Sequence, residues 1–262
     1  MKKKGLLSIA ILVTLFISSL FFGKLAFAAC MSVIAVFSLR ELLKIRGKDK
    51  FPIELELLSY IMVIFFTMNN FSFDLDYYLL DYRLMSALIL IDMIPLVLIN
   101  NKNKYNLSDA LYLIGSTMFI GLTFNLLLLF RSYNLNYVMY VFLIAFFTDL
   151  FAYITGKYIG THDFVTSISP KKTIEGAFGG LMMGTIIPSM YFISTINTTL
   201  PIYAIVIITM ALSALGQIGD LVFSFIKREH GRKDFVKGGG ILDVIDSIIF
   251  ISLAFVLVIS II

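Results

Sequence analysis

The sequence predicts an all-α, polytopic integral membrane protein, because three of its properties exclude an ordinary soluble domain. Of its 262 residues, 59% are hydrophobic and only 15% are charged. Soluble domains are about half apolar and about a quarter charged. The mean hydropathy is +0.94. Apolar runs of helix length follow one another along the chain, so we expect a bundle of membrane helices in a lipid bilayer.

About nine apolar runs approach the roughly 20 residues that a transmembrane helix needs. The second, third and fourth runs are short, which leaves eight or ten spans as alternatives. In chain order the predicted spans cover residues 5–23, 25–39, 57–72, 84–100, 108–130, 136–155, 174–195, 201–226 and 244–262.

The first run also has features of a secretory signal peptide. Met1-Lys-Lys-Lys4 precedes it and Ala26-Phe-Ala28 follows it, and these are the flanks of a cleavable signal. No soluble domain comes after it, so a retained first span is the simpler prediction.

Basic residues predict that the N-terminus is cytoplasmic. With that orientation, 18 of the 21 Lys and Arg residues fall in cytoplasmic segments, as the positive-inside rule requires. The loops 156–173 and 227–243, which carry the polar motifs, are then cytoplasmic.

The cysteine and histidine content of this chain indicates neither a disulfide nor a zinc site. Cys30 is the only cysteine, which excludes an internal disulfide. His162 and His230 have no Cys or His neighbours in the sequence, so we expect surface residues and not a zinc site.

The run 201–226 carries a polar stripe that continues past its end. At 100° per residue, one helix face holds Gln217, Asp220, Ser224, Lys227 and Arg228. Asp220 lies about 10 Å deeper in the membrane than Lys227. Snorkelling explains the two cations, but it does not explain an acid at that depth. A charge inside a membrane segment indicates a functional site.

The run 136–155 presents a second acid at a matching depth. Asp149 shares a helix face with Ala152, Tyr153 and Gly156. Two inward-facing carboxylates on different helices suit a hard divalent cation such as Mg²⁺. The alternative is a polar tie between helices.

The last run begins with glycines and two acids. Gly238, Gly239 and Gly240 precede Asp243 and Asp246. Glycine lets the backbone approach a ligand closely, and a helix N-terminus attracts an anion. Complementarity of the acids to the helix dipole is the alternative explanation.

The loop before residue 174 combines hydroxyl, cationic and acidic side chains. They are Ser169, Lys171, Lys172, Thr173 and Glu175. Lysines and hydroxyls can donate to phosphate oxygens. The spacing alone fits a basic attachment to anionic lipid equally well.

Two polar residues inside other spans have less definite roles. Asp92, close to Pro95, is predicted to be either a packing partner or a cavity wall. Asn125 is predicted to tie two helices together.

Together these motifs resemble the CDP-diacylglycerol synthase family, also called phosphatidate cytidylyltransferase. The matching segments are Asp149-x-x-Ala-Tyr153-x-x-Gly-Lys157, Ser169-Pro-Lys-Lys-Thr-x-Glu-Gly176, Gln217-x-Gly-Asp-Leu-x-x-Ser-x-x-Lys-Arg228, Lys233-Asp234 and Gly239-Gly-Ile-Leu-Asp-x-x-Asp246. The N-terminal half matches only as membrane helices, with Arg40-Glu41 a weak match. The resemblance implies N-terminal membrane helices over 1–135 and a C-terminal catalytic region over 136–262.

The resemblance implies transfer of a cytidylyl group from CTP to phosphatidic acid, which yields CDP-diacylglycerol and pyrophosphate. It also implies Mg²⁺, with a second cation such as K⁺. The implied metal ligands are Asp220 and Asp243, supported by Asp149, Asp234 and Asp246. The implied catalytic and substrate-binding residues are Asp220, Asp243, Lys227, Arg228, Ser169, Lys171, Lys172, Thr173, Glu175, Ser224, Lys233, Gly239 and Gly240. We expect a multi-pass protein of a bacterial inner or plasma membrane, without a nucleic-acid partner, and leave a homodimer open.

The sequence departs from the family pattern beside Asp243. The family usually has Pro-Gly-His-Gly-Gly before this aspartate and an arginine directly after it. Here the Pro-Gly-His positions are lost, the loop is shorter and Val244 replaces the arginine. A catalytically altered or inactive paralogue is therefore one alternative.

Other functions are also open. CTP-dependent transfer to another lipid, including a polyprenyl alcohol, is a second enzyme hypothesis. A transporter or channel with a cytoplasmic polyanion site would show inverted repeats and broken helices in both halves. Polar stripes occur only in the C-terminal half, which favours an enzyme.

Overall fold

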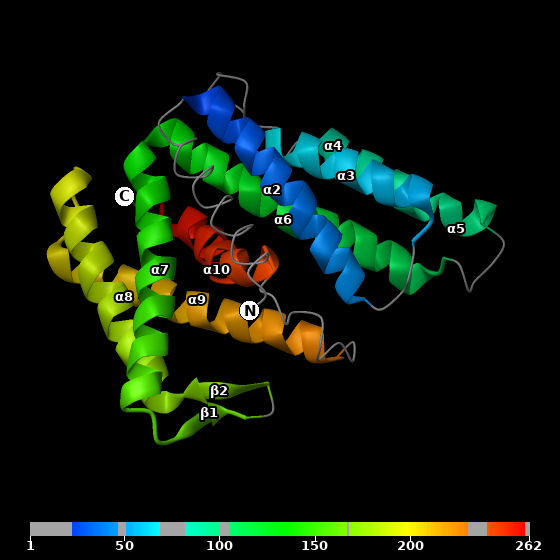
Figure 1. Cartoon of the computed structure of the whole chain (residues 1–262). Helices are drawn as coiled ribbons and strands as arrows, with labels where there is room; N and C mark the ends of the chain where they lie inside the picture. Colours follow the sequence, from blue (N-terminus) through cyan, green and yellow to red (C-terminus); the bar gives the residue numbers. More distant parts are fainter. Residues whose placement is uncertain are drawn as a thin grey trace. The chain divides into compact units, whose positions relative to one another are not determined.

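The computed structural model describes residues 23–46, 51–68, 82–99, 105–166, 168–229 and 240–259. The chain divides into two compact units. The N-terminal unit contains residues 1–132 with 234–242, and the C-terminal unit contains residues 133–233 with 243–262. Figure 1 shows the helices and strands with their labels.

The N-terminal unit is built from helices. In chain order they are α2 (Lys24–Ile45), α3 (Ile53–Met68), α4 (Tyr82–Met93), α5 (Pro95–Leu98) and α6 (Leu107–Tyr133). Gly121 lets α6 approach α3, because a Cβ at this position would lie 2.6 Å from Cβ of Phe66. Nδ2 of Asn125 donates to the carbonyl oxygen of Phe66 at 3.0 Å. The predicted helix tie by Asn125 is confirmed.

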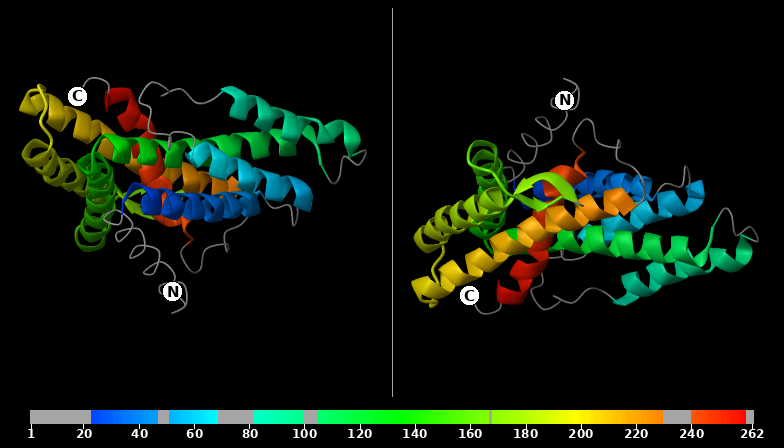
Figure 2. Two further views of the ribbon diagram at one scale, coloured as in Figure 1. Left: turned by 90° about the horizontal axis from the view of Figure 1, so that it is seen from above. Right: turned by 90° about the horizontal axis from the view of Figure 1, so that it is seen from below.

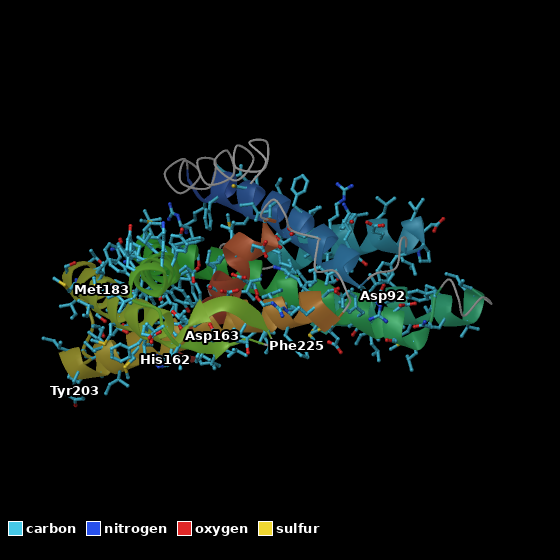
Figure 3. The ribbon with its side chains drawn as sticks, turned by 60° about the horizontal axis from the view of Figure 1, so that its bottom comes forward. Asp92, His162, Asp163, Met183, Tyr203 and Phe225 are labelled. Atoms are coloured by element: carbon cyan, nitrogen blue, oxygen red, sulfur yellow. The ribbon has the colours of Figure 1, made fainter. Side chains whose placement is uncertain are left out.

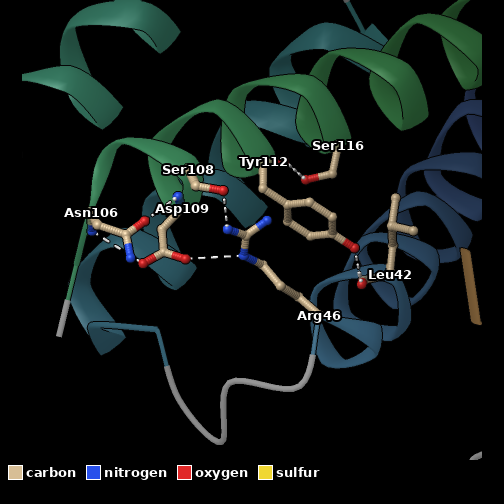
Figure 4. A network of polar contacts seen from close by, with 7 residues as sticks. All are labelled: Leu42, Arg46, Asn106, Ser108, Asp109, Tyr112 and Ser116. Atoms are coloured by element: carbon tan, nitrogen blue, oxygen red, sulfur yellow. Dashed lines mark hydrogen bonds and ion pairs between the residues drawn. The ribbon is translucent and has the colours of Figure 1, made fainter. Parts of the chain in front are cut away.

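A polar network joins the end of α2 to the start of α6 (Figure 4). Asn106 and Asp109 form a reciprocal cap, in which each side chain accepts from the other's backbone N–H, at 3.0 and 3.1 Å. Nε of Arg46 donates to Asp109 Oδ1 at 3.0 Å. The Tyr112 hydroxyl donates to the carbonyl of Leu42 at 2.7 Å. The buried Asp109 carboxylate thus has both a cation and N–H donors.

Asp92 in α4 is buried, and Figure 3 labels its position. Among the described residues, neither of its carboxylate oxygens has a hydrogen-bond partner. Its backbone carbonyl accepts from the Tyr105 hydroxyl at 2.7 Å. Burial, followed by the nearby Asp92 and Asp109 charges, raises the pKa of Tyr105, so this hydroxyl remains a donor. The hydrogen bond between α4 and the segment before α6 is therefore made by the backbone of Asp92 and not by its carboxylate.

The C-terminal unit contains helices and one small sheet. In chain order these are α7 (Leu135–Tyr158), β1 (Asp163–Val165), β2 (Ser169–Thr173), α8 (Ile174–Thr195), α9 (Ile202–Glu229) and α10 (Leu242–Ile259), whose first residue belongs to the N-terminal unit. α7 and α8 lie side by side, and α9 packs against both (Figure 2). The helical prediction is confirmed, but it missed the antiparallel pairing of β1 with β2.

Small residues explain how closely α7 and α8 approach. Gly176, Gly180 and Gly184 recur every fourth residue of α8. A Cβ on Gly180 would come within 2.6 Å of the carbonyl oxygen of Thr148 in α7. Spacing of this kind lets membrane helices pack backbone against backbone.

Within the described residues, six helices are long and apolar enough to cross a membrane, namely α2, α6, α7, α8, α9 and α10. A multi-span protein is confirmed, and the predicted count of about nine spans is wrong. Helix α3 has 16 residues, about 24 Å of helix against a hydrocarbon core of about 30 Å. The run 84–100 divides before Pro95, which has no N–H to continue the helix. The predicted span 5–23 falls almost wholly outside the described residues.

The cytoplasmic orientation stays a prediction, and two cysteine variants test it. In a Cys30→Ser background, Thr166→Cys lies in the exposed hairpin turn and Thr199→Cys lies in the exposed loop between α8 and α9. Impermeant maleimide added to intact cells should label position 199 and spare position 166, with the reverse in inverted vesicles. Labelling of position 166 from outside would contradict the orientation.

Candidate functional site

Three helices of the C-terminal unit bring acidic side chains close together. They are Asp149 of α7, Asp220 of α9 and Asp246 of α10, which interact electrostatically. Asp246 is 5% exposed, whereas Asp149 is exposed. The Ser247 hydroxyl donates to Asp149 Oδ1 at 3.4 Å. The sequence analysis placed Asp149 and Asp220 at matching depth, with both facing inward. The structure brings the two acids within electrostatic range, and their matching depth stays a prediction.

Each of the two principal predicted acids has a lysine partner. Nζ of Lys172 lies 2.5 Å from Asp220 Oδ2, with side chains 28% and 31% exposed. Lys227 forms an ion pair with Asp243, with side chains 16% and 30% exposed. The Ser224 hydroxyl donates to Asp220 Oδ1 at 3.4 Å. The unit therefore presents two partly exposed acid–lysine pairs beside a buried acid.

Some residues of the motif 169–176 form local structure, and one of them contributes a charge to the acidic cluster. Residues Ser169–Thr173 form β2. Thr173 caps α8, because its hydroxyl accepts from the backbone N–H of Gly176 at 3.1 Å. Lys172 alone among the described side chains of this motif reaches the acidic cluster, through Asp220.

Glu175 has partners that the sequence did not indicate. Its Oε1 accepts from the Thr161 hydroxyl at 2.8 Å and lies 2.6 Å from Nδ1 of His162. Its Oε2 accepts from the backbone N–H groups of Thr161 and His162 at 3.2 and 3.3 Å. Figure 3 shows His162 and its neighbour Asp163 at the hairpin. His162 is a surface residue, as predicted, and it helps Glu175 to fix the base of the hairpin.

The cap by Thr173 gives a stability prediction. Thr173→Val keeps the shape of the side chain and removes the acceptor, so the free energy of unfolding should fall by about 1 kcal/mol. Thr173→Ser keeps the acceptor and should match the parent. Thermal denaturation of the detergent-solubilised protein measures both, and equal melting temperatures for the valine and serine variants would contradict the cap.

Gln217 also has a structural contact. Its Nε2 donates to the carbonyl oxygen of Ala177 in α8 at 3.0 Å. The polar stripe on α9 therefore contains one helix tie, at Gln217, and a charged segment that begins at Asp220. Arg228 lies on the same helix and is partly exposed.

Gly240 lies in the N-terminal unit, against Glu41 of α2. Glu41 Oε2 accepts from the backbone N–H of Leu242 at 3.1 Å. Glu41 is a contact residue that the sequence noted only as part of a weak match. The predicted site residues Lys233, Asp234 and Gly239 lie outside the described residues, and the side chain of Lys171 is not described.

The carboxylate oxygens of the cluster suit Mg²⁺, but the described residues do not form a complete set of metal ligands. Carboxylate oxygens are the ligands that Mg²⁺ prefers. Within the described part of the chain, no group of three Asp, Glu, His or Cys side chains is arranged to hold a metal ion. Asp220 and Asp243 are each paired with a lysine. The assignment of metal ligands stays a prediction.

These features define a multi-span membrane protein with an acid–lysine cluster in its C-terminal unit. The chain belongs to the cytidylyltransferase family, whose profile matches residues 3–262. The resemblance indicated by the sequence motifs is confirmed.

Proteins similar to this chain are named phosphatidate cytidylyltransferase. That of Staphylococcus haemolyticus (strain JCSC1435) is 39% identical over 155 residues, covering 58% of this chain and 59% of the relative. That of Staphylococcus saprophyticus (strain ATCC 15305) is 37% identical over 175 residues, covering 65% and 67%. That of Staphylococcus aureus (strain COL) is 40% identical over 157 residues, covering 58% and 59%. The chain thus matches about three-fifths of the length of two of these relatives.

Proposed function

We propose that this protein transfers the cytidylyl group of CTP to phosphatidic acid at the cytoplasmic face of a bacterial cell membrane. The products are CDP-diacylglycerol and pyrophosphate. Membership of the cytidylyltransferase family supports this, as do relatives named for phosphatidate. The observation that carries the proposal is the pair of partly exposed contacts Lys172–Asp220 and Lys227–Asp243 beside Asp246.

The reaction brings two anionic substrates together, and the positive charges of the lysines offset their repulsion. A lipid phosphate oxygen attacks the α-phosphorus of CTP, and the bond from that phosphorus to the bridging oxygen of pyrophosphate breaks. Negative charge develops on the leaving pyrophosphate. Donors positioned beforehand stabilise such charge without reorganisation. Asp220 and Asp243 hold the ammonium groups of Lys172 and Lys227 in place, and phosphate oxygens take over as acceptors when substrate binds.

The remaining predicted residues complete this arrangement. We assign Mg²⁺ to Asp220 and Asp243, with Asp149, Asp234 and Asp246 supporting, because their oxygen donors suit this ion. When bound, Mg²⁺ supplies charge neutralisation on phosphate oxygens. Lys171, Lys233 and Arg228 supply further cations for phosphate, and a second cation such as K⁺ belongs to the same proposal.

A direct assay tests the proposed reaction. Purified protein in detergent receives Mg²⁺, CTP labelled at the α-phosphorus or, separately, at the γ-phosphorus, and either phosphatidic acid, another lipid phosphate or a polyprenyl alcohol. Labelled CDP-diacylglycerol should form only with phosphatidic acid, and chelation of Mg²⁺ should abolish its formation. Product with the polyprenyl alcohol alone would support the alternative transfer reaction. Absence of any CTP-dependent product would support an inactive paralogue.

The departure beside Asp243 provides a test of reduced activity. Val244 is 40% exposed, so an arginine fits there without displacing core residues. Val244→Arg, combined with Pro-Gly-His inserted before Gly239, should raise kcat/KM about tenfold, because a bidentate cation would be added next to the phosphates. Val244→Gln with the same insertion is the uncharged control. Equal rates for the arginine variant and the parent would contradict the weakened-enzyme interpretation.

A further inference from the structure

Glu41 makes a contact that its position in an apolar helix does not explain. It lies in α2, which is long and apolar enough to cross a membrane. Its carboxylate accepts from the backbone N–H of Leu242 at 3.1 Å. Leu242 is the first residue of α10. The first N–H groups of a helix have no acceptor inside the helix, so Glu41 supplies the acceptor that this amide lacks.

Gly240, which precedes this helix, lies directly against the same carboxylate. A Cβ on Gly240 would overlap the carboxylate of Glu41. Any other residue at position 240 therefore displaces either the backbone or the acid. The atoms that it would meet are the end of a flexible side chain, so a larger residue at position 240 displaces the Glu41 carboxylate more easily than the backbone.

We propose that Glu41 is a positioning residue for the start of α10. Its contacts with Gly240 and Leu242 fix the backbone directly before Asp243, the predicted catalytic acid. This inference rests on the proposed function for the role of Asp243, while the contact itself does not.

Kinetics of Glu41 variants test the proposal. Glu41→Ala should lower kcat for CDP-diacylglycerol formation by about 10- to 100-fold, because small misplacements of reacting groups have effects of that size. The KM for CTP should change less than kcat. Glu41→Gln keeps a carbonyl acceptor and should restore most of the rate. Glu54→Ala is the matched control, because Glu54 is an exposed acid of α3 in the same unit, and it should leave the rate unchanged.

A double substitution tests whether Gly240 serves Glu41. Gly240→Ala should reduce activity strongly in the parent, because the added methyl group meets the Glu41 carboxylate. In the Glu41→Ala background the same change meets no carboxylate, so its additional effect should be small. Independent effects that multiply in the double variant would show that the glycine is needed for another reason.

Hydrogen exchange provides a measurement that does not depend on activity. The Leu242 amide should be protected in the parent and in Glu41→Gln, and should exchange faster in Glu41→Ala. Normal protection in Glu41→Ala, or a normal kcat in this variant, overturns the proposal. If the parent makes no CDP-diacylglycerol, the proposed function fails while the exchange result still decides the Glu41 contact. If Glu41→Ala does not fold, the rates and the Leu242 amide exchange of Glu41→Gln and Gly240→Ala are compared with those of the parent.

Discussion

Replacing Asp220 with asparagine should reduce the rate of CDP-diacylglycerol formation by about 100- to 1,000-fold, the usual effect of losing an electrostatic group at a reacting centre. Asp220 holds Lys172 at 2.5 Å and lies within electrostatic range of Asp149 and Asp246. Asparagine keeps the size of the side chain and removes its charge. The variant loses both the proposed metal ligand and the group that orients the lysine.

The fold should survive this change. The Lys172–Asp220 pair is partly exposed, and ion pairs near water contribute about 0–1 kcal/mol. Gel filtration and thermal denaturation in detergent establish folding, and initial rates with labelled CTP establish activity. Asp163→Asn is the matched control, because Asp163 is an exposed acid on the hairpin of the same unit. A folded Asp220→Asn protein with the parental rate would refute the assignment.

The longer spans could be predicted from sequence because their signal is strong. The predicted span 174–195 coincides with α8, and the predicted span 136–155 lies within α7. Continuous apolar residues of spanning length leave few alternatives for the backbone in lipid. Of the three short runs, 25–39 became the candidate span α2. The 16-residue length of α3 and the break before Pro95 exclude the other two from the candidate spans.

The hairpin could not be predicted from the pattern of its residues. Strand β2 reads Ser-Pro-Lys-Lys-Thr, and proline and lysine are depleted in strands. Its pairing with β1 depends on tertiary context, since Glu175 holds Thr161 and His162 at the base. A family motif identified residues 169–176 as important. It did not separate the lysine that reaches Asp220 from the threonine and the glutamate that hold the backbone.

The acidic residues of the site were easier to identify than their partners. An acid on an apolar helix stands out in sequence, as Asp149, Asp220 and Asp246 did. Lys172 and Lys227 were predicted site residues, but ion pairing between distant segments leaves no periodic signal. Their pairing with Asp220 and Asp243 therefore emerged only from the structure. Glu41 was missed for the same reason, because its acceptor role depends on a backbone N–H far away in sequence.

A double substitution at Lys227 and Asp243 should distinguish catalysis from simple ion pairing. Removing one member of a partly buried pair leaves an uncompensated charge, while removing both restores neutrality. If the pair only stabilises the helices, Lys227→Gln and Asp243→Asn should each lower the melting temperature and the rate, and the combined variant should recover both. We expect recovery of the melting temperature alone.

The rate of the combined variant should stay at least about 100-fold below that of the parent. Lys227 is proposed to bind a phosphate and Asp243 to bind metal, and restored neutrality replaces neither function. Each single variant should be equally slow, because residues that act together at one step show non-additive losses. Arg131→Gln, in the last turn of α6, is the control for loss of a cation. A combined variant that regains the parental rate would show that the Lys227–Asp243 contact is structural, and would move the proposed chemistry to Asp220 and Lys172.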